Sequence, residues 1–348
     1  MPDAYTLRPM TSADGEAVRH LMEDDPDTGG MQVTARFVLD PVRVWRALKP
    51  DMEGAVAVAA DGRIVGTATV SFEDVQYNGR VIPSAYLENL KVHHTARGQG
   101  IATALAQWRV GQAKARFGGG DGVILTTTST DNTASLNTMK KWASQFHSPL
   151  VVSIRPTLRR APSAPKGLSA RKAAPDNFAR VAEESNQFYA AYQLYAPMSA
   201  KRLNALIGGA PDVYAYYIVT DASGTPVAGA LAVLRAAVVY DQIQNMPTPL
   251  RLANGILRIV PPDGRMRSLE INSLWHTRPD AAQYLWRMLR YLYREQASTV
   301  TVVFDPRSPL AAVFRIRPWH MPKLELVTAL HGPEPMDTAK PVCGTLRG

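Results

Sequence analysis

Two glycines and an arginine stand between an apolar strand pattern and an apolar helix pattern. The segment reads LENLKVHHTARGQGIATAL, from Leu87 to Leu105. Glycines at a helix start leave its first backbone N–H groups uncovered and let a ligand come close. Those groups and the positive end of the helix dipole attract anions, and Arg97 adds a guanidinium suited to phosphate. The pattern predicts a site for a pyrophosphate-like group.

The spacing of these glycines does not fit two other phosphate-binding motifs. The dinucleotide fingerprint needs a third glycine in the spacing G-x-G-x-x-G, and a P-loop needs Gly-Lys-Ser/Thr after the turn. Neither follows Gly98 and Gly100. A tight turn that needs small residues only for packing is the alternative that the turn alone leaves open.

The turn resembles motif A of the GCN5-related N-acetyltransferases (GNAT), whose pattern is Arg/Gln-x-x-Gly-x-Gly/Ala. Arg97, Gly100 and Ala102 fill its three defined places. As in that family, a strand precedes the turn, and a later strand leads to a helix that opens with Asn132. The likeness covers residues 4–155 in element order and is specific from Tyr86 to Ser135. It implies that the turn binds acetyl-CoA or another acyl-CoA as co-substrate.

The resemblance also implies which residues bind the acyl-CoA. Backbone groups at the end of the strand would hold the pantetheine arm, and the turn would hold the pyrophosphate. The predicted binding residues are Leu90, Lys91, Val92, Arg97, Gly98, Gln99, Gly100, Ile101, Ala102, Thr103, Asn132 and Ser135. No Cys/His cluster has metal-ligand spacing, so no metal is expected.

Glu88 is the predicted general base. Strand alternation places side chains 88, 90 and 92 on one face unless a bulge intervenes, and a carboxylate stands out beside Leu90 and Val92. In the family a glutamate at this end of the strand commonly deprotonates the acceptor amine, directly or through water. Burial would raise the pKa of Glu88 and make it a better base. A surface or salt-bridged glutamate is the alternative.

The usual proton donor of the family is missing. That donor is a tyrosine about seven residues after the helix-opening Asn, where this chain has Met139. A thioether cannot donate a proton. The thiolate could leave unprotonated, or Ser135, Ser144 or a nearby tyrosine could serve; the sequence leaves these choices open.

The acceptor is expected to be a primary amine of a small molecule or a peptide. In the family, the region between the first two helices borders the acceptor site, and here it holds the acidic run Glu23–Asp27. Four carboxylates would attract a cationic acceptor. A solvated acidic turn explains the run equally well.

The elements around the turn predict a mixed α/β fold. Expected strands cover residues 4–7, 55–60, 64–71, 84–92, 123–128 and 150–154, and expected helices cover 13–22, 41–48, 98–117 and 132–145. After a Pro-rich basic stretch the order repeats, with helices at 176–189, 199–207, 280–296 and 309–314 and strands at 214–220, 228–234, 268–275, 299–304 and 324–328. A repeat on this scale indicates two copies of one domain.

We therefore expect two tandem GNAT-like domains, each a mixed, mostly antiparallel twisted sheet flanked by helices. The predicted boundaries are 1–156 for the catalytic domain, 157–172 for a basic linker, 173–330 for a degenerate second copy and 331–348 for a C-terminal tail. At the place of the glycine turn, the second copy has Trp275–Ala282 without glycine. It is expected to bind no CoA and to form a wall of the acceptor pocket.

Charge and composition limit the partners and the cellular location that we expect. Residues 1–156 carry 16 basic and 16 acidic side chains, so the net charge of +9 lies entirely in the rest of the chain. No nucleic-acid motif accompanies this basic half, and a solvated linker explains it. One cysteine, no signal-peptide pattern and no long apolar run predict a cytoplasmic protein without a membrane span. We expect a monomer or a homodimer.

The sequence thus predicts an acyl-CoA-dependent N-acyltransferase, with acetyl-CoA as the expected donor and direct attack by the amine. The alternative is a non-catalytic acyl-CoA-binding sensor or scaffold, which the missing tyrosine at Met139 favours and the intact turn and Glu88 oppose.

Overall fold

The computed structural model describes residues 5–24, 32–49, 51–257, 260–314 and 323–344. The elements of the first half are the strands β1 (Tyr5–Pro9), β2 (Gln32–Phe37), β3 (Met52–Ala59), β4 (Ile64–Tyr77), β5 (Arg80–Val92), β6 (Val123–Ser129) and β7 (Gln145–Pro156), and the helices α1 (Gly15–Asp24), α2 (Pro41–Leu48), α3 (Ile101–Phe117) and α4 (Thr133–Met139). Short 3₁₀ turns occupy Ser12–Asp14 and His94–Ala96.

The second half repeats this arrangement and adds to it. Its strands are β8 (Ser169–Lys172), β9 (Tyr214–Thr220), β10 (Pro226–Val233), β11 (Val239–Asn245), β12 (Arg265–Met266), β13 (Ser268–His276), β14 (Thr299–Phe304) and β15 (Lys323–His331). Its helices are α5 (Phe178–Phe188), α6 (Ala200–Gly209), α7 (Thr248–Leu257), α8 (Pro279–Leu292) and α9 (Leu310–Phe314). Further 3₁₀ turns lie at Pro175–Asn177 and Arg235–Ala237.

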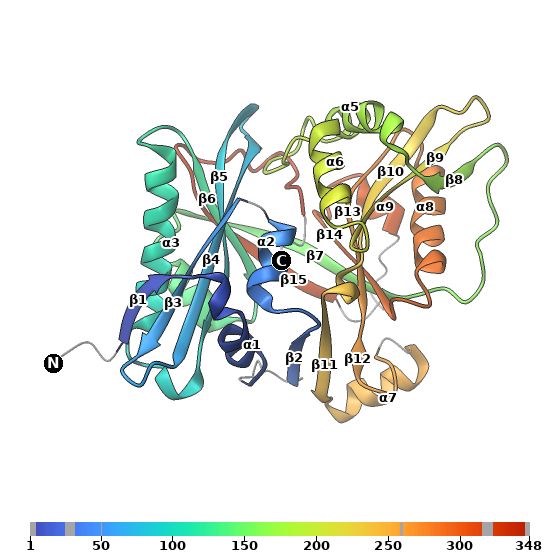
Figure 1. Cartoon of the computed structure of the whole chain (residues 1–348). Coiled ribbons are helices and arrows are strands. Elements are labelled where there is room, and N and C mark those ends of the chain that lie inside the picture. The colour runs from blue at the N-terminus through green and yellow to red at the C-terminus, as the bar shows by residue number, and fades with distance from the viewer. Residues whose placement is uncertain (1–4, 25–31, 50, 258–259, 315–322, 345–348) are drawn as a thin grey trace.

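One continuous sheet of 12 strands runs through both halves (Figure 1), in the order β1-β3-β4-β5-β6-β15-β7-β14-β13-β10-β9-β8. Counted inward from either edge, β1-β3-β4-β5-β6 and β8-β9-β10-β13-β14 follow the same order. Each set is antiparallel except for one parallel pair, β5 with β6 and β13 with β14. The predicted fold class is confirmed: each half contributes a mixed, mostly antiparallel sheet flanked by helices.

The last strand of each half completes the sheet of the other half. β7, from the first half, pairs with β14 from Val151↔Phe304 to Pro156↔Thr299. β15, from the second half, pairs with β6 from His331↔Ile124 to Leu326↔Ser129. β7 and β15 also pair with each other. The two halves are therefore joined through backbone hydrogen bonds at the centre of the sheet.

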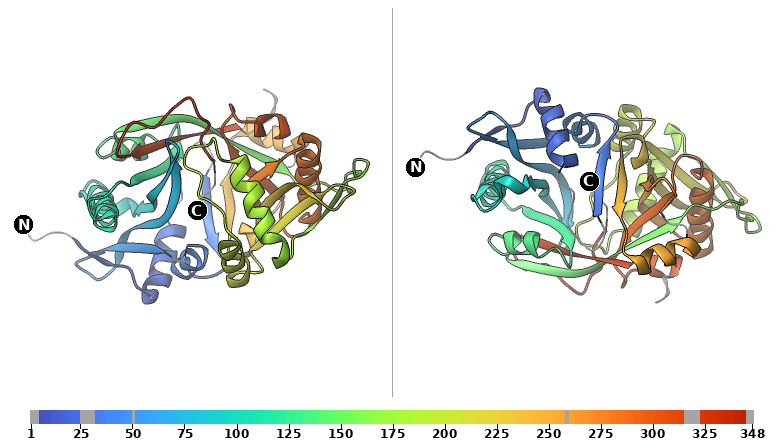
Figure 2. Two further views of the ribbon diagram at one scale, coloured as in Figure 1. Left: turned by 90° about the horizontal axis from the view of Figure 1, so that it is seen from above. Right: turned by 90° about the horizontal axis from the view of Figure 1, so that it is seen from below.

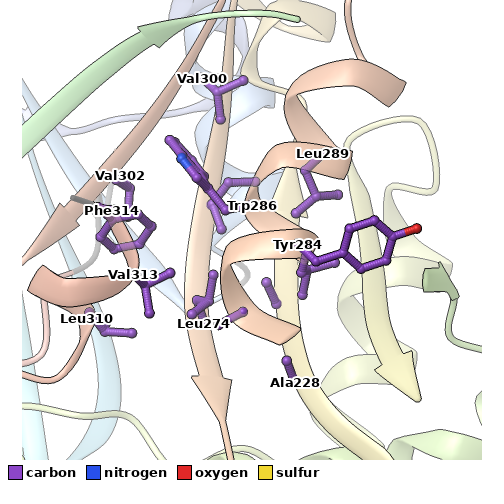
Figure 3. Close-up of a cluster of buried hydrophobic side chains, with 14 of the residues drawn as sticks. Ala228, Leu274, Tyr284, Trp286, Leu289, Val300, Val302, Leu310, Val313 and Phe314 are labelled. Carbon is purple, nitrogen blue, oxygen red and sulfur yellow. The ribbon is translucent and has the colours of Figure 1, made fainter. Parts of the chain in front are cut away.

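Equivalent helices cover equivalent faces. α3 packs on β3, β4 and β5 at one end of the molecule, and α8 packs on β9, β10 and β13 at the other (Figures 1 and 2). Figure 3 shows the apolar cluster under α8, where Trp286 meets Phe314 and Leu289 lies beside β10 and β13. α1, α2, α5 and α6 lie between the halves and share one apolar cluster that includes Val18, Trp45 and Leu203.

Several elements were not expected from the sequence. β2 pairs with β11 of the second half, and β12 completes this small sheet; α7 follows β11. α4 ends at Met139, well before Gln145, and β7 begins at Gln145 instead of residue 150. The reason is that the chain turns at Lys140–Ser144, where Ser144 N donates to Leu330 O, and then joins the β15 ladder.

The predicted linker and tail both carry structure. The last residues of the linker form β8, and Leu158 N donates to Arg290 O of α8. In the tail, Val342 and Cys343 are buried, and Cys343 N donates to Gln193 O. Residues 345–348 lie outside the described residues.

Candidate functional site

The predicted phosphate turn is an open loop that leads into a long helix. Gly98 and Gly100 have φ angles of 80° and 82°, in the left-handed region that favours glycine. A Cβ placed on Gly98 would meet nothing within 4 Å, and one on Gly100 would meet only Tyr5 Oη at 4.0 Å. Space therefore lies in front of the first backbone N–H groups of α3. We call Arg97–Thr103 the cradle.

Positive and capping groups gather around the cradle. The exposed Arg97 also donates through Nε to Val92 O at 3.3 Å, which ties it to the end of β5. Lys141 Nζ, beyond α4, donates to Thr103 Oγ1 at 3.0 Å. Asn132 caps α4 by accepting from Ser135 N at 3.1 Å. The structure thus brings α4, with two predicted binding residues, next to the first turn of α3.

β5 and β6 stop pairing just before the predicted pantetheine residues. Their last pair is Tyr86↔Leu125. Beyond this pair, the β5 carbonyls accept hydrogen bonds from side chains and no longer from the β6 backbone. Thr126 Oγ1 donates to Leu87 O at 2.7 Å, and Arg109 Nη1 donates to Glu88 O at 3.0 Å. Residues Leu90 to Val92 therefore lie where the edge of β5 is not paired with β6.

A β-bulge changes the direction of the side chains on β5. The register with β4 shifts between Thr67 and Thr69, and Asn89 has a φ of 51°. Leu90 and Val92 pack in the α3 cluster with Ile101 and Leu105, while Glu88 points to the other face of the sheet. The expectation that 88, 90 and 92 share a face is wrong, because the extra residue of the bulge reverses the alternation.

Glu88 is a buried, paired carboxylate. Its side chain is 5% exposed. Oε1 accepts from Lys49 Nζ, and Oε2 accepts from Ser71 Oγ at 3.1 Å. The Lys49 ammonium also lies 5.6 Å from the ring centroid of Tyr86. Glu88 is thus salt-bridged, as in the alternative stated above, and is buried at the same time.

A cavity of about 460 Å³ lies beside Glu88 and between the halves. Its walls include both hydrogen-bond partners of Glu88 and come from β4, α2, α6, β10, β13 and the tail. The lining residues are Ala47, Leu48, Lys49, Asp51, Ser71, Phe72, Glu73, Tyr195, Ala196, Met198, Arg202, Ala205, Leu206, Tyr214, Leu231, Val233, Glu270, Asn272, Ser273 and Cys343. The second half therefore forms one wall of this space.

Charged groups of both halves meet in the cavity. Arg202 Nη2 of α6 pairs with Glu73 Oε2 of β4 at 2.6 Å. Glu270 of β13 is buried and pairs with Arg235 Nη1 at 3.3 Å. Burial raises the pKa of the Glu270 carboxyl, and Arg235 opposes that rise. The cavity thus offers both carboxylates and cations to a ligand.

One polar residue near Glu88 was not identified from the sequence. Tyr86 lies two residues before Glu88 on the same face of β5, and its hydroxyl is hydrogen-bonded to Thr127 Oγ1 of β6. This hydroxyl lies where β5 and β6 stop pairing. Met139, at the place of the family tyrosine, is buried. The two-residue spacing from Glu88 was the signal that could have identified Tyr86.

The described residues of the acidic run, Glu23 and Asp24, do not line the cavity. Glu23 belongs to α1 and accepts from Arg36 Nη1 at 2.8 Å and from Phe37 N at 2.9 Å. Asp25–Asp27 lie outside the described residues. Among the residues that the structure describes, no cluster of His, Cys, Asp or Glu could hold a metal ion, and no helix is long and apolar enough to cross a membrane.

The second half keeps the bulge but not the cradle. Ser273 has a φ of 49° at the register shift between β10 and β13. When the two bulges are superposed, Asn272 of β13 corresponds to Glu88 of β5, so an amide replaces the carboxylate. α8 begins at Pro279 after Arg278, and no glycine occurs between Trp275 and Ala282.

Comparisons with known proteins bear on the family and the fold of this chain. The family model of the acetyltransferase (GNAT) family matches residues 17–143. Saccharomyces cerevisiae N-myristoyltransferase with bound myristoyl-CoA has 10% identity and a TM-score of 0.67, over 95% of this chain and 83% of that chain. A GCN5-related N-acetyltransferase from Sphaerobacter thermophilus has 18% identity and a TM-score of 0.57, over 97% and 98%.

A third similar structure is a GCN5-related N-acetyltransferase from Anabaena variabilis, with 13% identity and a TM-score of 0.51, over 93% of this chain and 72% of that chain. A search of curated proteins finds no match. At these identities the solved structures establish the fold, and the family model covers the cradle and Glu88. The chain therefore carries a GNAT-family domain at residues 17–143, within a fold that extends over both of its halves.

Proposed function

We propose that this protein is an acyl-CoA-dependent N-acyltransferase that transfers the acyl group directly to a primary amine. One observation carries the proposal: the buried Glu88 lies near the end of β5, the open cradle follows that end after one short turn, and a cavity adjoins Glu88. A donor at the cradle and an acceptor in the cavity would meet at the bulge. Holding both substrates in this way can lower the barrier by about 7–11 kcal/mol.

The cradle and the unpaired edge of β5 suit the acyl-CoA. The pyrophosphate would accept from the first N–H groups of α3 beside Gly98 and Gly100, with Arg97 and Lys141 as counter-charges. The pantetheine arm would lie along Leu90–Val92, where β6 no longer pairs. Backbone N–H groups at the bulge would then stabilise the thioester oxygen as negative charge develops on it.

Glu88 and Tyr86 would handle the protons. Glu88 takes a proton from the acceptor ammonium, the free amine attacks the thioester carbon, and the C–S bond breaks as the amide forms. The leaving thiolate needs a proton, and the Tyr86 hydroxyl at the β5–β6 junction is the group that we assign to supply it. This assignment fills the role left open by Met139.

The cavity limits the size of the acceptor, which the sequence does not. A volume of about 460 Å³ is that of a small-molecule site, and it suits a small amine or the end of a peptide. Glu73 and Glu270 favour an acceptor with a cationic group, while Arg202 tolerates an anionic one. One structure with a similar fold holds myristoyl-CoA. The experiment therefore compares a short and a long acyl chain.

The test is a thiol-release assay with acetyl-CoA and myristoyl-CoA against small amines, polyamines and peptides with a free N-terminus. Amine-dependent release of CoA with one donor supports an N-acyltransferase and gives the acyl length. Tight binding of acyl-CoA without turnover of any amine would favour the non-catalytic sensor or scaffold. Absence of acyl-CoA binding would contradict both functions.

A further inference from the structure

Lys49 places a primary amine directly on the proposed general base. It follows α2, with its backbone N–H bonded to Trp45 O at 2.8 Å, and its side chain is 20% exposed. Nζ donates to Glu88 Oε1 and lies 5.6 Å from the Tyr86 ring centroid. The amine is thus held on the two residues to which we assign proton transfer.

Lys49 also lines the acceptor cavity. Because Ser71 bonds the other oxygen of Glu88, Oε1 is the atom to which an incoming ammonium would donate. In this structure the Lys49 ammonium already makes that contact. Lys49 is thus an amine of this chain that already stands in the place expected of an acceptor.

We propose that Lys49 is acylated by the acyl-CoA bound to its own chain. The inference rests on the proposed function. Glu88 accepts a proton from the Lys49 ammonium, and the neutral Nζ attacks the thioester carbon. The N–C bond forms, the C–S bond breaks, and CoA leaves as a thiol with a proton returned by Tyr86 or solvent. No oxidant, metal or further reactant is required.

The modification has a consequence for the site. An amide nitrogen carries no positive charge, so the ion pair with Glu88 is lost when Lys49 is acylated. Oε1 then no longer accepts from the Lys49 ammonium, and this change favours the approach of the ammonium of an external acceptor. Lys49 acylation would convert the site from a self-paired state to one that receives acceptors.

The test uses the purified full-length chain and acetyl-CoA. After incubation without any acceptor, the intact mass should increase by one acetyl group, and peptide mapping should locate it on Lys49. Lys49→Arg keeps the positive charge and should abolish this increase. Glu88→Gln should slow it by about 10²–10⁴-fold. Lys114→Arg, on the exposed face of α3, should leave it unchanged.

Two controls make the outcome decisive. The rate constant should not depend on protein concentration; a proportional increase would show transfer between chains and overturn the proposal. Thiol release with external amines is measured in parallel. Turnover of amines without label on Lys49 overturns this inference and leaves the proposed function standing, whereas absence of acyl-CoA binding overturns both. Equal labelling of Lys49 and Lys114 would show chemical acetylation only and would also overturn it.

Discussion

Asn89 and Ser273 have nearly the same backbone conformation, with φ angles of 51° and 49°, at equivalent positions of the two halves. Asn89 lies where the register between β4 and β5 shifts, and Ser273 where the register between β10 and β13 shifts. Non-glycine residues adopt this left-handed conformation only occasionally, and Asn is among those that tolerate it best. The bulge is therefore a property of the fold, and only the first half combines it with a cradle and a carboxylate.

The bulge at Asn89 should be needed for acyl-CoA binding. Asn89→Val places a β-branched residue at a positive φ, a strain of about 1–3 kcal/mol that favours a regular strand. We expect a lower melting temperature and weaker acetyl-CoA binding by calorimetry, while Asn89→Gly keeps both. Ser273→Val is the matched control: it should lower the melting temperature similarly without weakening CoA binding. Equal loss of affinity in both variants would contradict a specific role of Asn89.

The cradle prediction can be tested at Gly100. Gly100→Asp adds a carboxylate near the expected pyrophosphate, so the affinity for acetyl-CoA should fall at least about tenfold, or about 1.4 kcal/mol. Gly224→Asp, in the hairpin turn before β10, imposes a similar backbone strain at a φ of 84° far from the cradle. It should leave affinity unchanged. Calorimetry should show one site per chain, and two equal sites would disprove the loss of binding in the second half.

Glu88→Gln should reduce catalysis without reducing CoA binding. The amide keeps the shape of the side chain but cannot accept the proton of the acceptor ammonium. We expect kcat to fall by about 10²–10⁴-fold, and the acidic limb of the pH–rate profile to flatten. Ser71→Ala removes one hydrogen bond to Glu88 and should have a smaller effect. A Glu88→Gln variant that keeps more than about a third of kcat would place the base elsewhere.

Asp305 should make stability depend on acid pH. Burial alone would raise its pKa, but hydrogen bonds from His147, Arg307 and the backbone N–H of Val342 hold the pKa well below its usual range. A lowered pKa stabilises the fold above the unfolded value of about 3.9, and this contribution is lost as the pH falls through the folded pKa. Asp305→Asn should therefore lower the free energy of unfolding at pH 7 by about 1.5–3 kcal/mol.

The measurement is chemical denaturation of the parent and Asp305→Asn from pH 7 downward. The difference between the two should shrink as the pH falls below about 4. Asp121→Asn removes an exposed pair with Arg80 and should cost at most about 1 kcal/mol. A difference at Asp305 that does not change with pH would show that the carboxylate charge is not responsible.

A break in the linker should not separate the halves. Residues 159–167 precede β8 and offer a place to insert a protease site. After cleavage the fragments should still co-elute in gel filtration, because β7 and β15 hold them together. Residues 1–168 expressed alone would lack β15 beside β6 and should be unstable. Two fragments that separate and stay folded would contradict this interpretation.

The sequence predicted the parts of the fold that local pattern determines. The glycines of the cradle, the hairpin between β3 and β4, and the β-branched strand β14 all follow from residue type and spacing. It did not predict β2 or β11, because the pairing between them joins strands more than 200 residues apart, and the other neighbour of β11 is the two-residue strand β12. Their stability comes from tertiary pairing, which no local window contains.

The same distinction applies to the candidate site. Cradle residues Arg97–Ala102 could be found from one stretch of sequence, and so could Glu88. The Lys49 partner of Glu88 could not, because Lys49 follows α2, far from β5 in the sequence, and approaches β5 across the sheet face. The bulge at Asn89 was also missed, since an Asn in a strand pattern does not by itself indicate a positive φ. Because the bulge was not foreseen, Glu88 was expected on the same face of β5 as Leu90 and Val92, and it lies on the opposite face.

The reciprocal placement of β7 and β15 has the form of a domain-swapped dimer, in which two identical chains trade one element. Here a single chain holds both partners, so their association does not depend on protein concentration. Duplication of one gene segment and fusion of the copies would produce this arrangement. In such a chain only one copy needs its glycines and its glutamate, and the other copy can serve as a wall of the cavity beside Glu88.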